Sequence, residues 1–245
     1  MARVLSTFVE SERPCVYLPG ERARQDVRVM VDVGPEEYER LLERGYRRFG
    51  AVYFRPACTA CGECRSIRVP VETFQPSQAQ RRARKACADL RVELGPPRVD
   101  DERLALFARW HAAREVARGW DPSPTDRDSY FQCFAFPHVC ARELAFYDDA
   151  PEAGGKLVAI AIADETPRAW SAVYCFYDPA YARRSVGVAS VLLQIELARG
   201  RGVPHVYLGY RVAGCASLAY KARYAPHELL IGRPGDDEPA IWAPP

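Results

Sequence analysis

The stretch of sequence that decides the fold is Arg184-Ser185-Val186-Gly187-Val188-Ala189, which joins an expected strand to an expected helix. Backbone N–H groups at the start of such a helix point outward, and the helix dipole favours a negative charge there. A small residue at Gly187 would let a phosphate approach the backbone closely. The stretch therefore predicts an anion-binding turn, unless Gly187 only allows the helix to pack tightly against a strand.

The segments on either side of this turn alternate between strand and helix patterns. Apolar or alternating runs predict strands over 157–163, 169–177, 205–210 and 227–232, and helical periodicity predicts helices over 186–199 and 217–222. This order indicates an α+β (mixed α/β) fold, with a site expected where a helix begins just after a strand.

The first half of the chain is expected to form its own domain. It contains a helix that begins at Pro35, strands over 46–55 and 66–74, and a helix opened by a capping box at Ser77 and Gln80. Gly95-Pro96-Pro97 then breaks the chain, so we expect one domain over 1–95 and a second over 96–245. The second is expected to begin with a helix over 101–118 and a loop over 119–125.

The helix after Ser77 carries a cluster of basic residues, namely Arg81, Arg82, Arg84 and Lys85. Such a helix could hold the phosphates of a nucleic acid electrostatically. The alternative is an ordinary solvated helix face, because basic runs are common on protein surfaces.

Three of the nine cysteines are closely spaced as Cys58-x-x-Cys61-x-x-Cys64, and Cys15 is the natural fourth member. Thiolates at this spacing can converge on one metal ion or cluster, so the pattern favours a zinc or iron–sulfur site. The alternative is a reduced cysteine-rich loop without metal. An odd cysteine number without an export signal argues against a disulfide framework.

Composition excludes several classes of protein. Hydrophobic residues make up 48% of the chain and charged residues 27%, with a net charge of +2. No stretch approaches the roughly 20 apolar residues that a membrane helix needs, and the first twelve residues lack an apolar signal core. We therefore expect a cytoplasmic protein without membrane contact, and we take it to be a monomer.

Tyrosines and cations gather in the last strand–helix segment, in Tyr207-Leu208-Gly209-Tyr210 and Tyr220-Lys221-Ala222-Arg223-Tyr224. Aromatic side chains there could stack on the unpaired bases of an RNA end, and Lys221 and Arg223 could bind phosphates or an acidic side chain. The alternative is that some of these tyrosines belong to the core, Tyr207 in particular.

The anion-binding turn has the form Arg-x-x-Gly-x-Ala, which resembles the phosphate-binding turn of the GNAT acyltransferases. In those enzymes the turn holds the pyrophosphate of coenzyme A. The expected strand, helix and final strand that follow also match the GNAT order. The resemblance implies a GNAT-like acyltransferase domain in the second half of the chain.

A wider resemblance rests on several segments in a fixed order. They are Pro14–Gly20, Gly45–Gly50, Arg55–Cys58 with Cys61 and Cys64, Pro76-Ser77 with Gln80–Arg82, Ser171–Tyr174, Tyr177–Pro179, Tyr181–Ser185 with Gly187, Tyr207–Tyr210, Gly214-Cys215 and Tyr220–Arg223. Together they resemble the arginyl-tRNA–protein transferases of the N-degron pathway, in particular the short bacterial branch, the aspartate/glutamate leucyltransferases. The match runs from about Pro14 to Leu230, nearly the whole chain.

This resemblance implies a reaction and its partners. Leucyl-tRNA, or arginyl-tRNA in the eukaryotic branch, donates its aminoacyl group to the α-amine of a protein that begins with Asp or Glu, which marks that protein for degradation. No cofactor beyond the aminoacyl-tRNA is expected for transfer. Arg184 and Gly187, with Arg81, Arg82 and Arg84, would then hold tRNA phosphates rather than coenzyme A.

Aminolysis of an activated ester requires a deprotonated amine and a stabilised oxyanion. Asp178 and Glu196 are the candidates for taking the proton or holding the ammonium, although Asp178 could only cap a turn and Glu196 could be an exposed helix residue. Basic side chains should recognise the acidic first residue of the acceptor, and the candidates are Arg47, Arg48, Lys221 and Arg223. Tyr210 and Tyr220 complete the expected substrate site.

Departures from the family pattern leave the donor open. In the family, basic residues are usual at the positions that here are Glu21 and Gln78-Ala79, and a lysine–methionine pair is usual where this chain has Ser217-Leu218. The residues between the cysteines also carry less positive charge than usual. Two rival interpretations therefore remain. One is a coenzyme A-dependent N-acetyltransferase that uses the same turn, and the other is a non-catalytic RNA- or protein-binding module.

Overall fold

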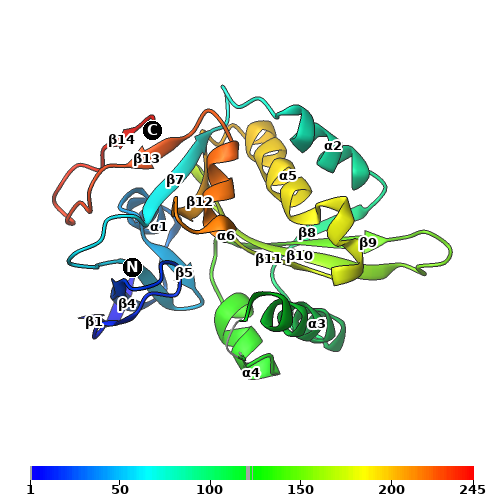
Figure 1. The fold of residues 1–245 in the computed structure, drawn as a ribbon, viewed down its shortest axis with the longest axis horizontal. Coiled ribbons are helices and arrows are strands. Elements are labelled where there is room, and N and C mark those ends of the chain that lie inside the picture. The colour runs from blue at the N-terminus through cyan, green and yellow to red at the C-terminus, as the bar shows by residue number, and fades with distance from the viewer. Residues whose placement is uncertain (1, 120–121, 123) are drawn as a thin grey trace.

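The computed structural model describes residues 2–119, 122 and 124–245 (Figure 1). Residues 120, 121 and 123, which belong to the expected loop over 119–125, lie outside the described residues. The described chain forms a four-stranded sheet, an eight-stranded sheet and a two-stranded ribbon, with helices packed on the sheets. The expected mixed α/β fold is confirmed.

The four-stranded sheet comes from the beginning of the chain and has the order β1-β4-β6-β5. Its strands are β1 (Arg3–Val9), β4 (Gln25–Val31), β6 (Val52–Pro56) and β5 (Arg47–Phe49), and β2 (Arg13–Pro14) pairs with β3 (Arg22–Ala23) beside it. Helix α1 (Pro35–Glu43) begins at the expected proline and buries Tyr38, Leu41 and Leu42. These side chains share a small core with Tyr46 and Tyr53.

The expected single strand over 46–55 is instead two strands, β5 and β6, joined by a tight turn at Gly50. This glycine has a φ of 54°, and a Cβ at this position would collide with the backbone oxygen of Gln132. Only glycine adopts this conformation without strain in so little space. The turn therefore folds β5 back onto β6.

The eight-stranded sheet has the order β14-β13-β7-β12-β11-β10-β9-β8. Its strands are β7 (Arg65–Pro70), β8 (Arg91–Gly95), β9 (Ala141–Asp148), β10 (Lys156–Glu165), β11 (Ala169–Tyr177), β12 (His205–Arg211), β13 (Glu228–Leu230) and β14 (Trp242–Ala243). Its members β7 and β8 come from before residue 96, so the sheet runs across the expected domain boundary. The division at residue 95 stays a prediction.

The parallel pair β11 and β12 is joined by α5 (Val186–Gly200), the expected helix after the anion-binding turn. The two strands pair only from Ala169 to Ser171 and from His205 to Tyr207. Their later residues, such as Val173 and Gly209, line one cavity from different sides. This divergence positions the candidate site.

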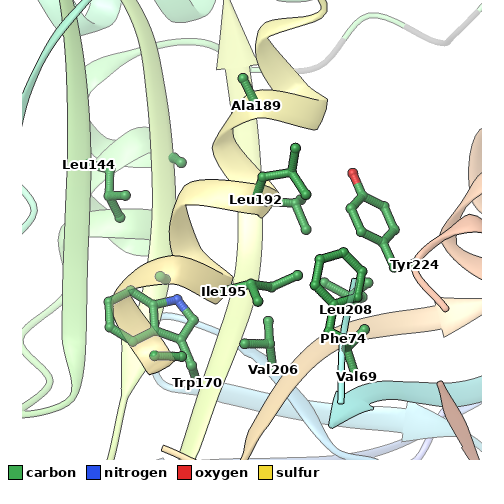
Figure 2. Close-up of a cluster of buried hydrophobic side chains, with 14 of the residues drawn as sticks. Val69, Phe74, Leu144, Trp170, Ala189, Leu192, Ile195, Val206, Leu208 and Tyr224 are labelled. Atoms are coloured by element: carbon green, nitrogen blue, oxygen red, sulfur yellow. The ribbon is translucent and has the colours of Figure 1, made fainter. Parts of the chain in front are cut away.

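Helices cover both faces of the large sheet (Figure 1). The upper face carries α5 and α2 (Gln78–Ala86), and the lower face carries α3 (Asp101–Arg118), α4 (Arg127–Tyr130) and a π-helical turn (Phe131–Ala135). Figure 2 shows Leu192 and Ile195 of α5 facing Trp170 and Val206 of the sheet, and all four are buried. The expected helix over 217–222 is present as α6 (Ala216–Ala219) followed by a 3-10 turn (Tyr220–Arg223).

None of the described helices is long and apolar enough to cross a membrane.

Candidate functional site

A cavity of about 590 Å³ lies where β11 and β12 diverge. Its walls come from both strands, from α3, from the start of α5 and from the 3-10 turn after α6, with β5 contributing Arg47. Among the described residues, its lining contains cations, aromatic rings and small apolar side chains, but no Asp or Glu. The cavity is therefore suited to a ligand that carries negative charge.

Arg47 is a buried cation of the cavity, with 9% of its surface exposed. Its Nη2 donates to the backbone oxygens of Ala172 at 2.7 Å and Val173 at 3.2 Å. Its Nε and Nη1 are buried and have no hydrogen-bond partner among the described residues. These N–H groups of a fixed guanidinium remain available to donate to an acceptor such as a carboxylate oxygen.

Lys221 lies beside Arg47 in the same cavity. A Cβ placed on Gly209 would collide with Arg47 Nη1 and would lie 3.5 Å from Lys221 Nζ, so both cations approach the same glycine. Burial, and then the positive charge of Arg47, lowers the pKa of Lys221 to about 7. Within the described part of the chain, neither cation forms an ion pair with a carboxylate.

The start of α5 faces the cavity through Ser185 and Gly187. Ser185 has a left-handed backbone with a φ of 57°, and α5 begins directly after it at Val186. The side chain of Arg184 points elsewhere, because its Nε donates to Ala86 O at 2.7 Å. The turn can therefore bind an anion through its backbone, whereas the Arg184 side chain ties α5 to α2.

Aromatic side chains form the wall opposite the cations. Trp110, Tyr174, Tyr177 and Tyr220 line the cavity, and Arg114 covers the Trp110 ring with its guanidinium carbon 4.0 Å from the ring centre. Sequence reasoning missed Trp110 and Arg114. Their spacing of four residues on α3 was the available signal, since it places them on one side of the helix.

The tyrosines of the sequence prediction divide into two groups. Tyr207 is 5% exposed and packs edge-on against Trp242, so its expected core position is confirmed. Tyr210 is also buried, and its hydroxyl donates to Gly45 O at 3.1 Å and Phe54 O at 3.0 Å. Tyr220 keeps 38% of its surface exposed, so it remains free to contact a ligand.

The other two candidate cations have different surroundings. Arg48 is 4% exposed and is paired with Asp164 of β10, which also accepts from the Tyr38 hydroxyl at 2.7 Å. This buried pair joins the small sheet to the large one. Arg223 is exposed and does not line the cavity. Arg48 thus lines the same cavity as Arg47 and Lys221 but is already paired with Asp164, whereas Arg223 lies outside the lining.

The two candidate carboxylates lie outside the cavity lining. Asp178 accepts from the backbone N–H of Ala180 at 3.0 Å and from Lys156 Nζ at 2.7 Å. Burial is the largest single influence and raises the pKa of Asp178, but the hydrogen bonds from Lys156 and Ala180 and the charges of Lys156 and Arg109 together outweigh it and lower the pKa of this carboxyl. Glu196 accepts from Arg84 on the outer side of α5. Their catalytic roles stay predictions that the geometry does not support.

The basic helix α2 offers two exposed arginines, Arg81 and Arg82, for phosphate contacts. Arg84 is paired with Glu196 at 3.0 Å. The capping box that opens the helix is confirmed, since Ser77 Oγ accepts from the Gln80 backbone and Gln80 Oε1 accepts from the Ser77 backbone.

The cysteine loop is held by Arg233, which donates to Cys58 O at 2.5 Å and to Cys61 O at 2.6 Å. Burial raises the pKa of Cys64 to about 12, and Cys15, Cys58 and Cys61 lie close enough to contribute. No group of three or more His, Cys, Asp or Glu side chains among the described residues is arranged to hold a metal ion. The thiols as placed do not fit a metal, so the zinc or iron–sulfur site stays a prediction.

Comparison with solved structures concerns the fold. The solved structure of FemX has a similar fold, with a TM-score of 0.51 at 10% identity over 84% of this chain and 69% of that chain. This likeness supports the expected GNAT-like fold.

The particular family follows from sequence. Models described as arginine-tRNA-protein transferase, N terminus and C terminus, match residues 13–82 and 102–231. The aspartate/glutamate leucyltransferase of Halorhodospira halophila is 37% identical over 224 residues, covering 89% of this chain and 91% of that protein. That of Chromohalobacter salexigens is 36% identical over 241 residues, covering 95% and 93%. The chain belongs to the arginine-tRNA-protein transferase family and is an aminoacyl-tRNA–protein transferase.

Proposed function

We propose that this enzyme transfers leucine from leucyl-tRNA to the α-amine of proteins that begin with Asp or Glu, which marks them for degradation. The observation that carries the proposal is Arg47, whose Nε and Nη1 are buried without a partner beside Lys221. An unpaired buried guanidinium is costly, and an acidic side chain supplies the missing charge and acceptors. The relatives named aspartate/glutamate leucyltransferase support the same acceptor class.

The choice of leucine over arginine as the donor rests on the cavity lining. Arginine would bring a further cation next to Arg47, Lys221 and Arg114, and no Asp or Glu of residues 2–119, 122 and 124–245 lines the cavity to receive it. Apolar side chains are available for a leucyl group, including Val173, Val188, Val191, Leu208 and Leu218. Burial of the leucyl side chain among them is favourable by the hydrophobic effect.

The tRNA would approach the cavity with its aminoacylated 3′ end. The backbone at Ser185 and Gly187 would receive a phosphate, and Trp110 and Tyr220 would receive unpaired bases by stacking. The proposal treats the enzyme as a monomer. It places the reaction in the cytoplasm, where aminoacyl-tRNA is made.

The test is a transfer assay with purified protein and tRNA charged with radiolabelled leucine or, separately, arginine. Matched reporters begin with Asp, Glu, Asn, Gln, Ala or Lys, and a parallel arm supplies labelled acetyl-coenzyme A. The proposal expects leucine on the Asp and Glu reporters alone. Transfer only from arginyl-tRNA would overturn the donor, and acetylation without aminoacyl transfer would overturn the reaction.

A further inference from the structure

Two neighbouring cations of the cavity face a substrate that carries two charged groups. The first residue of an acidic acceptor presents its α-ammonium group and, a few bonds away, its side-chain carboxylate. Arg47 is fixed by the carbonyls of Ala172 and Val173, and Lys221 Nζ approaches the same glycine, Gly209. A carboxylate held on Arg47 therefore brings the α-nitrogen next to Lys221. This step rests on the proposed function.

We propose that Lys221 is the general base of the reaction: its amine takes a proton from the acceptor's α-ammonium group while Arg47 holds the acidic side chain. In the part of the chain that the structure describes, the cavity offers few other bases, because no Asp or Glu lines it. Asp178 is occupied by Lys156 and Ala180, and Glu196 is occupied by Arg84.

Tyrosine hydroxyls in the cavity are unsuited to accept this proton. Burial raises the pKa of Tyr17, Tyr210 and Tyr220, so these hydroxyls stay protonated at neutral pH. Lys221 differs because burial and Arg47 lower its pKa to about 7, so that half of it is a neutral amine near that pH. The side chains of Cys215 and Cys64 have the opposite effect and raise the pKa of Lys221. The Arg47 guanidinium on β5 is the positive charge that faces Lys221.

The step is balanced in protons and bonds. Neutral Lys221 takes one proton, which leaves a lone pair on the α-nitrogen. That nitrogen attacks the carbonyl carbon of the aminoacyl ester, and the carbon–nitrogen bond forms as the bond to the ribose oxygen breaks. The Lys221 ammonium then gives its proton to the departing ribose oxygen, the amide nitrogen releases its extra proton to solvent, and Lys221 is neutral again.

The same arrangement couples acceptor identity to chemistry. A carboxylate bound on Arg47 places a negative charge near Lys221 and favours its protonated form, which drives the proton transfer forward. An amide at that position supplies no charge. Acceptors that begin with Asn or Gln should therefore be slow in kcat as well as weakly bound.

Lys221→Arg separates the two roles that a lysine could have here. Arginine keeps the positive charge but stays protonated in proteins, so it can bind a carboxylate but cannot accept a proton. Lys221→Met removes both abilities. The matched control is Lys156→Arg, a lysine that pairs with Asp178 outside the cavity lining. Thermal unfolding midpoints confirm that each variant is folded.

The experiment measures kcat and KM for leucine transfer to an Asp reporter from about pH 5.5 to 9, with wild-type and variant enzymes. Wild-type kcat/KM should rise with pH through about 7 and then level off, because the neutral form of Lys221 in the free enzyme is the active one, and the rise in kcat should lie at higher pH because the bound carboxylate favours protonated Lys221. Lys221→Arg should lose roughly 100- to 10,000-fold in kcat with little change in KM, and its profile should lack this rise. Lys156→Arg should match the wild type.

Two results would overturn the assignment and can be told apart. Lys221→Arg with near wild-type kcat and the same pH profile would make Lys221 a binding residue only, while the proposed function stands. Wild-type enzyme without transfer from either tRNA would sink the proposed function, and the role of Lys221 with it. If Lys221→Met does not fold, Lys221→Arg alone decides, since it keeps the charge and approximate length.

Discussion

Gly209 of β12 lies directly against the guanidinium of Arg47, in the space that any other side chain would need. A Cβ at Gly209 would collide with Arg47 Nη1, and the glycine has a φ of 77°, which favours glycine. The position of Arg47 in the cavity therefore requires that residue 209 of β12 has no side chain.

Replacement of Gly209 by alanine should displace Arg47 and reduce kcat/KM for Asp and Glu reporters at least tenfold. Gly202→Ala is the matched control, because Gly202 has a φ of 69° but nothing within 4 Å of an added Cβ. Both variants carry the strain of a left-handed alanine, and only one carries the collision. Equal activity of the two variants would contradict the importance of the Gly209–Arg47 contact.

Replacement of Arg47 by methionine should remove the preference for acidic acceptors. We expect the ratio of kcat/KM for Asp over Asn reporters to fall about 10- to 100-fold, since a charged hydrogen-bonded site contributes about 1.5–3 kcal/mol. Arg223→Met is the control, because Arg223 is exposed and outside the cavity lining. Unchanged selectivity in Arg47→Met would place acceptor recognition elsewhere.

Replacement of Arg48 by methionine should destabilise the protein by about 3–5 kcal/mol, because it leaves Asp164 buried without its cation. Urea unfolding monitored by circular dichroism measures the change. Arg91→Met is the comparison, because Arg91 pairs with Asp149 on the surface, where solvent screens the pair and its loss has little effect on stability. A loss below that of Arg91→Met would argue against the structural role of the Arg48–Asp164 pair.

Asp178 should contribute to stability in a pH-dependent way. Its pKa in the folded state is lowered, so its stabilising effect is present above the unfolded pKa of about 4 and is lost as pH falls through the folded pKa. Asp178→Asn should therefore lower the free energy of unfolding by about 1 kcal/mol at pH 7 and by less in acid. The effect is this small because Lys156 is half exposed and solvent screens its charge. Denaturant titrations at pH 7 and in acid measure this change in the free energy of unfolding. A shifted kcat profile near pH 7 would instead assign Asp178 to catalysis.

Arg81 and Arg82 should contact tRNA phosphates from α2. The double change Arg81→Gln and Arg82→Gln should lower the slope of log K against log salt for tRNA binding by about 2, which corresponds to two lost phosphate contacts. Filter binding over a series of salt concentrations gives the slope. Arg98→Gln, a change at an exposed arginine near Glu93, should leave it unaltered. A slope that stays the same in the double variant would remove α2 from the tRNA site.

Local patterns predicted much of the second half of the chain. The glycine turn and apolar periodicity located α5 within a residue or two, and Arg47 and Lys221 were both among the candidate cations. Such patterns depend on neighbours in sequence, which fix a helix start or a strand.

Long-range packing decided what sequence could not. Arg47 and Arg48 are equivalent candidates for substrate binding in the sequence, because no local pattern shows that Arg48 pairs with Asp164 on β10. The sequence places Asp178 near the anion-binding turn, but it does not show that Lys156 pairs with Asp178. Strand β12, which forms one side of the cavity, pairs with β7 from much earlier in the chain, and no local sequence signal encodes that pairing.

The position of β7 between β12 and β13 governs how the protein can be made. During synthesis β7 leaves the ribosome long before the residues of either neighbour, so both of its edges stay open for most of translation. Its apolar residues Ile67 and Val69, which are fully buried in the finished sheet, are exposed in that interval. A chain that stops before β12 would carry an unpaired apolar strand, which promotes aggregation and recognition by chaperones.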